Sequence, residues 1–167
     1  MNKKGFTLIE LLIVIALLGI LALALLAAID PFEQLKKGRD TGTRNGVEEL
    51  YNASLRYYAI RGEFPWEGTT LNATQALEMT DFIQSIVEAG EIKEEFLMDP
   101  DRLERLWVTS THADILDNMD DLAVCFSPES RAFRIDQNTI YDPDGQRNTT
   151  DCPTTDYETH TCFWCIR

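Results

Sequence analysis

The chain has 167 residues, 26% of them charged, and its 28 acidic against 15 basic residues give a formal net charge of −13. This length suits one modest domain beside an anchor. The acidity argues against nucleic acid as a partner, because phosphate binding needs a basic patch. We therefore expect one polar domain with an acidic, solvated surface.

The N-terminal run from Phe6 to Ile29 is strongly apolar and carries a single charge, Glu10. As a helix rising 1.5 Å per residue it would be about 36 Å long, enough to cross a hydrocarbon core of about 30 Å. Lys3 and Lys4 precede the run and predict a cytoplasmic N-terminus with the rest of the chain outside. We expect a single membrane-spanning helix.

The order of parts around Gly5 differs from that of a secretory signal peptide, whose small-residue cleavage site follows the apolar run. A cut after Gly5 would leave the whole apolar helix on the mature protein. Glu10 needs a partner there, because a carboxylate in hydrocarbon costs about 2.5–3.5 kcal/mol. The new amine at Phe6 is a candidate, since residues four apart share a helix face. The pair could form within one chain or between neighbours shifted along a shared axis.

The stretch GFTLIELLIVIALLGILA resembles the class III signal and stem of type IV prepilins and type II secretion pseudopilins. The resemblance is close over residues 1–29 and continues loosely to about Trp66. It implies cleavage between Gly5 and Phe6 by a prepilin peptidase, N-methylation of Phe6, and neutralisation of the new N-terminus by Glu10. It also implies self-assembly, through an inner-membrane platform, into a helical filament with apolar stems at its centre.

Many members of that family carry a proline in the last part of the apolar run, where the stem melts or kinks. Here the first proline is Pro31, just after the run, so the resemblance leaves the position of any bend open. Gly38, Gly42 and Gly46 then recur on one helix face, each costing about 1 kcal/mol against alanine. They predict either a stretchable or closely packed segment of a fibre, or simply a weak helix.

A helical pattern returns before Gly62, with apolar and aromatic residues at i, i+3 and i+4 spacing that predict one face lying under a sheet: Val47, Leu50, Tyr51, Leu55, Tyr57 and Tyr58. Gly62 ends this helix and Pro65 prevents a restart. We therefore divide the chain into a leader (1–5), a stem helix (6–29), its amphipathic continuation (30–66) and a globular head (67–167).

The first part of the head predicts helix. Asn72 and Gln75 form a variant capping box before a second amphipathic helix that Gly90 ends. Its apolar positions are Leu77, Phe82, Ile83, Ile86 and Val87. The segment Ile92–Met98 predicts a short helical turn, stopped by Asp99-Pro100.

The sheet is expected last in the chain, from short segments bounded by turn residues. The expected strands are 106–108, 122–126, 132–135, 139–141 and 161–166. Ser127 to Ser130 reads as a hairpin loop, and Asp142 to Gly145 as a turn. The expected fold is α+β and pilin-like, a long N-terminal helix packed on a small antiparallel sheet.

Four cysteines lie in the C-terminal third: Cys125, Cys152, Cys162 and Cys165. In an exported domain an even number indicates disulfides first, and four cysteines allow three connectivities. If the last residues form a strand, Cys162 and Cys165 point to opposite faces and take different partners, Cys125 and Cys152 between them. A four-thiolate zinc site, for which only one C-x2-C knuckle exists, and free thiols remain alternatives.

Two acidic clusters are candidate calcium ligands, Asp117 with Asp120 and Asp121, and Asp142 with Asp144. Each supplies too few oxygens alone, because calcium takes six to eight. The resemblance keeps calcium as the minor interpretation, since secretion members of the family can bind it in C-terminal loops. The main interpretation is a turn and a solvated face, with no cofactor.

The sequence offers no readable catalytic set, and its histidines, His112 and His160, fall in polar loops. The leading hypothesis is a structural filament subunit of a pilus or pseudopilus, not an enzyme. The alternative is a minor, tip-located pilin that acts as an adhesion or substrate-binding module. Either would be a single-pass membrane protein before assembly and an extracellular or periplasmic filament component afterwards.

Overall fold

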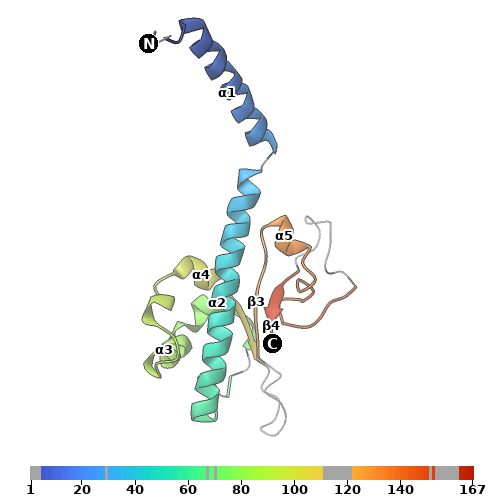
Figure 1. Ribbon diagram of the computed structural model, residues 1–167. Helices are drawn as coiled ribbons and strands as arrows, with labels where there is room; N and C mark the ends of the chain where they lie inside the picture. Colours follow the sequence, from blue (N-terminus) through green and yellow to red (C-terminus); the bar gives the residue numbers. More distant parts are fainter. Residues whose placement is uncertain are drawn as a thin grey trace. The chain divides into compact units, whose positions relative to one another are not determined.

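The computed structural model describes residues 5–28, 30–66, 68–69, 71–110, 122–150, 152 and 162–167. The chain forms two compact units, which we call the stem unit (Met1–Leu35) and the head unit (Lys36–Arg167). Helix α1 (Leu8–Ala28) lies in the stem unit, and helix α2 (Pro31–Arg61) begins there and continues through the head unit (Figure 1).

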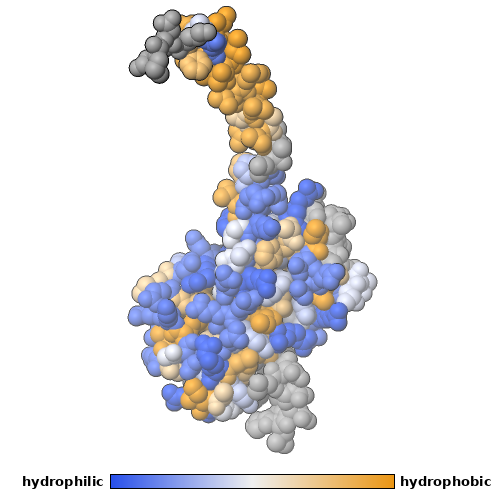
Figure 2. All heavy atoms as spheres, in the orientation of Figure 1, coloured by the Kyte–Doolittle hydropathy of each residue, from blue (hydrophilic) through white to orange (hydrophobic). Residues whose placement is uncertain are grey.

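Helix α1 is apolar on every side. Within the described residues, Leu8–Leu26 is the one helical stretch long and apolar enough to cross a membrane, with a mean hydropathy of 3.0. Its large apolar side chains are between 50% and 83% exposed, and Figure 2 shows them as a continuous apolar surface. Such a surface needs lipid or other apolar helices around it, because apolar area in water is unfavourable.

The stem is interrupted directly after the apolar run. Helix α1 ends at Ala28 and α2 begins at Pro31. The Asp30 carboxylate accepts hydrogen bonds from the backbone N–H groups of Phe32 (3.0 Å) and Glu33 (3.3 Å). Aspartate caps a helix N-terminus well, and proline suits the first helical position because no N–H is needed there. The start of α2 therefore follows from Asp30-Pro31.

In the head unit, α2 buries one face in the main core. Val47, Leu50 and Ala53 are at most 2% exposed and cluster with residues of the sheet and of the helices that follow it. The helix ends at Arg61, and Gly62 takes a φ of +79° while its N–H donates to the carbonyl of Tyr58. The predicted helix end at Gly62 is confirmed.

The head unit contains a four-stranded antiparallel sheet with strand order β1-β2-β3-β4. The strands are β1 (Leu71–Gln75), β2 (Trp107–Ser110), β3 (Leu122–Phe126) and β4 (Trp164–Ile166). Alternate residues of β3 separate into two clusters, as the two faces of a strand require. Val124 joins the α2 core, whereas Cys125 joins a smaller cluster on the other face. The α+β, pilin-like fold is as expected.

Short helices join β1 to β2 and follow β3. They are the 3-10 helices η1 (Ala76–Met79) and η2 (Glu94–Phe96) and the α-helices α3 (Thr80–Glu88), α4 (Pro100–Arg105) and α5 (Arg131–Arg134). The predicted second amphipathic helix corresponds to α3. This helix ends at Glu88, and Gly90 follows it with a φ of +79°, as expected.

The expectation that the sheet comes last is wrong, because β1 precedes α3. Asn72 and Gln75, which are predicted to cap a helix, lie in this strand. Ala73 has a φ of +46° at a register shift, and its N–H donates to the Thr109 hydroxyl at 3.1 Å. Pairing with β2, more than thirty residues away, overrides the local capping signal.

Three other local predictions are corrected. The expected strand 132–135 is largely helix α5, whose first turn is capped by the Ser130 hydroxyl, which accepts from the Phe133 N–H. Asp99-Pro100 not only stops a turn but starts α4, since the Asp99 carboxylate accepts from the Arg102 N–H at 3.1 Å. The segment 139–141 forms only isolated bridges at Tyr141.

Candidate processing and assembly site

Thr7 and Glu10 form a capping box at the start of α1. Oε2 of Glu10 accepts from the Thr7 N–H at 2.8 Å and from the Thr7 hydroxyl at 2.7 Å. The Thr7 hydroxyl oxygen in turn accepts from the Glu10 N–H at 3.3 Å. This reciprocal pattern satisfies two donors that a helix N-terminus otherwise leaves unpaired. The carboxylate is therefore fixed beside the first residues of the helix.

Gly5 and Phe6 lie just outside that box. Both are exposed, and the Phe6 side chain is 91% exposed. A chain beginning at Phe6 would keep Thr7, Glu10 and all of α1, with its new amine one residue before the cap. Cleavage, methylation and the role of Glu10 in assembly stay predictions.

Thr7, which was not predicted as a partner of Glu10, is its partner in the structure. The signal was present, since Thr-x-x-Glu before an apolar run is the pattern of a capping box. Thr7 provides a local partner for the carboxylate that does not depend on cleavage.

The cysteines form two disulfides, Cys125–Cys165 and Cys152–Cys162. Cys125 and Cys165 are directly paired residues of β3 and β4, with Cα atoms 4.1 Å apart. Cys162 lies before β4 and binds Cys152 instead, so the expected split of Cys162 and Cys165 between two partners is found. All four thiols are used, which leaves neither a free thiol nor a four-thiolate zinc site.

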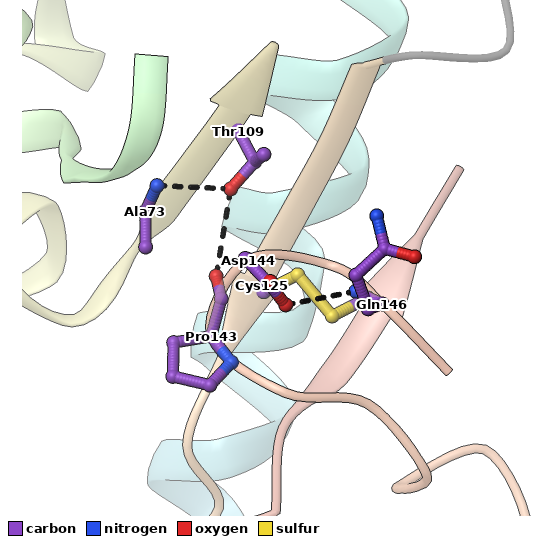
Figure 3. Close-up of a disulfide and its surroundings, with 7 residues drawn as sticks. Ala73, Thr109, Cys125, Pro143, Asp144 and Gln146 are labelled. Carbon is purple, nitrogen blue, oxygen red and sulfur yellow. Dashed lines mark hydrogen bonds between the residues drawn. A yellow bond between two sulfur atoms is a disulfide. The ribbon is translucent and has the colours of Figure 1, made fainter. Parts of the chain in front are cut away.

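The turn formed by Asp142 to Gly145 lies over the face of the sheet that carries Cys125 (Figure 3). Gly145 has a φ of +73°, and a Cβ placed on it would lie 2.7 Å from the Ala123 side chain. The Thr109 hydroxyl lies 3.5 Å from the Pro143 carbonyl and also accepts from the Ala73 N–H. This contact joins the turn to the irregular part of β1.

The calcium candidates Asp142 and Asp144 both belong to this turn. The Asp144 carboxylate accepts from the Gln146 N–H at 3.1 Å, and that of Asp142 accepts from the Asn148 amide at 3.1 Å. Across the described ranges, no group of three or more histidine, cysteine or acidic residues is placed to share a metal ion. Asp117, Asp120 and Asp121 lie outside the described residues, as do His112 and His160. Calcium binding stays a prediction.

Asp40 is a structural residue that the sequence did not single out. It is fully buried on α2 and accepts from the backbone N–H and hydroxyl of Ser130, each at 2.7 Å. It also accepts from the Glu129 N–H, and Arg105 of α4 lies 3.6 Å away. Three segments distant in sequence therefore meet at one carboxylate.

Comparison with known proteins supports the resemblance of the N-terminal segment to prepilins. Residues 1–26 match the family model of the prokaryotic N-terminal methylation motif. Over 91 residues the chain is 34% identical to a fimbrial protein of Neisseria meningitidis serogroup A / serotype 4A. That match covers 54% of this chain and 51% of the relative, so the chain spans about half the length of the curated relative it matches. No solved structure matches the chain.

Neither the motif nor the relative carries the name of an enzyme. The motif matches the part of the chain that holds Gly5, Phe6, the Thr7–Glu10 capping box and most of α1. The head that follows has the pilin-like α+β arrangement of one long helix against an antiparallel sheet. The chain thus carries a prokaryotic N-terminal methylation motif and is consistent with the type IV pilin family.

Proposed function

We propose that this protein is a structural subunit of a type IV pilus-like or pseudopilus filament. A prepilin peptidase cleaves it between Gly5 and Phe6, and the new N-terminus at Phe6 is methylated. The observation that carries the proposal is α1, an exposed helix that is apolar apart from Glu10 and begins two residues after Phe6, within the stretch that matches the methylation motif. In the membrane this surface is covered by lipid, and in the filament by the stems of other copies.

Glu10 has a defined part in this exchange. It is the one charged residue of α1. An ionised carboxylate has about four lone-pair positions, and the two Thr7 bonds occupy only some of them. The remaining positions accept the Phe6 amine of a neighbour. The pairing neutralises two charges that would be costly inside an apolar bundle.

Three variants separate the charge of Glu10 from its capping role. Glu10→Gln keeps an N3 side chain that can complete a capping box but removes the charge. We expect Glu10→Ala and Glu10→Gln both to lower filament yield at least about tenfold, because the amine then stays unpaired in hydrocarbon. Thr7→Val removes only the hydroxyl and keeps yield within about threefold, since a cap is worth about 1 kcal/mol. Membrane levels of each variant serve as the control.

A wild-type filament yield from Glu10→Gln would contradict charge neutralisation. Intact mass of the protein from its own cells tests the processing step. A chain beginning at methylated Phe6 is expected, with two disulfides, and a chain that still begins at Met1 would overturn the proposal.

The alternative of a minor, tip-located subunit with an adhesion or substrate-binding role differs in stoichiometry. A major subunit accounts for most of the filament mass, whereas a tip subunit is present in trace amounts. Quantifying the subunit in purified filaments decides between the two.

A further inference from the structure

The end of the head unit where α2 enters is basic in an otherwise acidic chain. We define the basic surface as residues 36–45 of α2 and residues 127–140, which include α5. The bonds from Ser130 to Asp40 hold these segments together. They contain six basic and three acidic residues, and counting Glu48, which pairs with Arg44 at 3.0 Å, the net formal charge is +2. Lys37 and Arg131 are exposed on it.

The segment between β1 and β2 has the opposite character. We define the acidic surface as residues 78–104, which contain nine acidic and two basic residues, a net formal charge of −7. Most of these carboxylates are exposed, among them Glu94 and Glu95 of η2. Met98 lies beside them with 68% of its surface exposed. The basic surface has a matching apolar residue in Ile135, which is 52% exposed.

The two surfaces occupy different sides of the head unit. Helices α3 and α4 lie on one side of α2, and α5 lies on the other (Figure 1). On the α4 side the packing is close, since a Cβ placed on Gly46 would lie 3.0 Å from the Arg102 side chain. Glu94 and Glu95 of η2 are exposed, so their carboxylates are available to another molecule.

We propose that the acidic surface of one copy docks on the basic surface of a second copy. The inference rests on the proposed filament function and names the contact between neighbouring heads. Because the two surfaces differ, the contact is heterologous, and heterologous contacts that do not close build open helical filaments. The opposite charges also set orientation, since like-charge juxtaposition disfavours other registers.

The partner that docks on the basic surface is a second copy, because the chain itself carries the complementary acidic surface. An anionic membrane would attract the basic surface but repel the acidic surface and the rest of the chain. Copies anchored by their stems in one membrane are also held at high effective concentration, which favours weak contacts between heads.

Charge reversal on the full-length chain tests the contact. Lys37→Glu with Arg131→Glu reverses the basic surface, and Glu94→Lys with Glu95→Lys reverses the acidic surface. We expect each pair to lower filament yield at least about tenfold, because like charges then face each other. All four substitutions together restore the attraction and return the yield to within about threefold of wild type.

Arg61→Glu is the matched control. It makes the same single charge reversal as Lys37→Glu, at an exposed position of α2 that lies 24 residues from Lys37 and about 36 Å along the helix. It should leave filament yield unchanged. Equal thermal unfolding temperatures and intact disulfides would show that the variants fold.

Two results would overturn the head contact while leaving the filament function in place. One is an unchanged filament yield in both charge-reversed double variants. The other is a loss of filament yield that the variant with all four substitutions does not restore. If instead the basic reversal leaves filaments intact but releases the head from vesicles containing anionic lipid, the basic surface binds headgroups. A wild-type chain that never assembles would refute the filament function and this contact together.

Discussion

The Asp40 carboxylate accepts a 2.7 Å hydrogen bond from the Ser130 hydroxyl, across 90 residues of sequence. The same oxygen accepts from the Ser130 N–H, so one buried side chain of α2 fixes the start of α5. Arg105 approaches this carboxylate at 3.6 Å and pairs with Glu129 at 2.6 Å. This buried carboxylate therefore anchors the two segments of the basic surface to each other.

Replacing Asp40 should destabilise the head strongly. Asp40→Ala leaves the buried Glu129 and Ser130 N–H groups without their acceptor, while Arg105 keeps its pairing with Glu129. Breaking a buried charged network by removing one partner costs about 3–5 kcal/mol. Ser130→Ala removes one hydroxyl and should cost about 1–2 kcal/mol. Urea unfolding of the full chain in detergent measures both, and equal losses for the two variants would contradict the anchoring role.

The Gly145 turn predicts a second stability difference. Gly145→Ala meets both a positive φ and the Ala123 side chain, at 2.7 Å from the new Cβ. Gly90→Ala meets a similar φ of +79° but no atom within 4 Å. We expect a cost of about 1–2 kcal/mol for Gly90→Ala, and about 1–3 kcal/mol more for Gly145→Ala from overpacking.

Thermal or urea unfolding compares the two variants directly. Because the conformational strain is shared, the difference between them reports the close approach of the turn to the sheet. Equal costs would mean that the turn moves away from Ala123 without penalty.

The disulfides should differ in their contribution to stability. Cys125–Cys165 spans 40 residues of sequence and Cys152–Cys162 spans 10. In the chain-entropy description the longer loop contributes about 4 kcal/mol and the shorter about 3 kcal/mol. Paired serine substitutions, Cys125→Ser with Cys165→Ser and Cys152→Ser with Cys162→Ser, measure each. A larger loss from the second pair would show that the short loop matters through its contacts rather than through entropy.

Sequence reasoning succeeded where the signal is local. The strand 122–126 was predicted with its observed bounds, and the helix end at Gly62 follows from glycine's access to positive φ. It failed at β1 and α5, whose conformations depend on Thr109 and Asp40, each distant in sequence. The secondary-structure propensity of a short segment does not include contacts with residues distant in sequence. At β1 and α5 these tertiary contacts outweigh the local preference.

At the candidate site, too, the features that depend on local sequence were predictable and those that depend on distant residues were not. The apolar helix and Glu10 were readable from residue type alone. The Thr7 partner is also local, since Thr-x-x-Glu before an apolar run is the pattern of a capping box. The pairing of the cysteines could be narrowed by strand alternation, but only the register of β3 with β4 places Cys165 opposite Cys125.

The glycines of α2 allow a last prediction, which decides between two readings of their spacing. Gly38 and Gly42 have no atom within 4 Å of an added Cβ, whereas Gly46 faces Arg102 at 3.0 Å. Gly38→Ala and Gly42→Ala should therefore stabilise the isolated subunit, each by up to about 1 kcal/mol, since alanine is the better helix former. Gly46→Ala should gain less, because the Arg102 side chain must move.

Filament yield of the stabilised double variant, Gly38→Ala with Gly42→Ala, then separates the readings. If the glycines only weaken the helix, filaments form at the wild-type level. If another helix packs closely on this face, or the segment melts during assembly, yield falls although the subunit itself is more stable. Thr41→Ala, at a neighbouring exposed position of the same helix, controls for general effects of substitution there. We expect the double variant to lose yield and the control to keep it, because the open space beside both glycines leaves room for the backbone of a neighbouring copy.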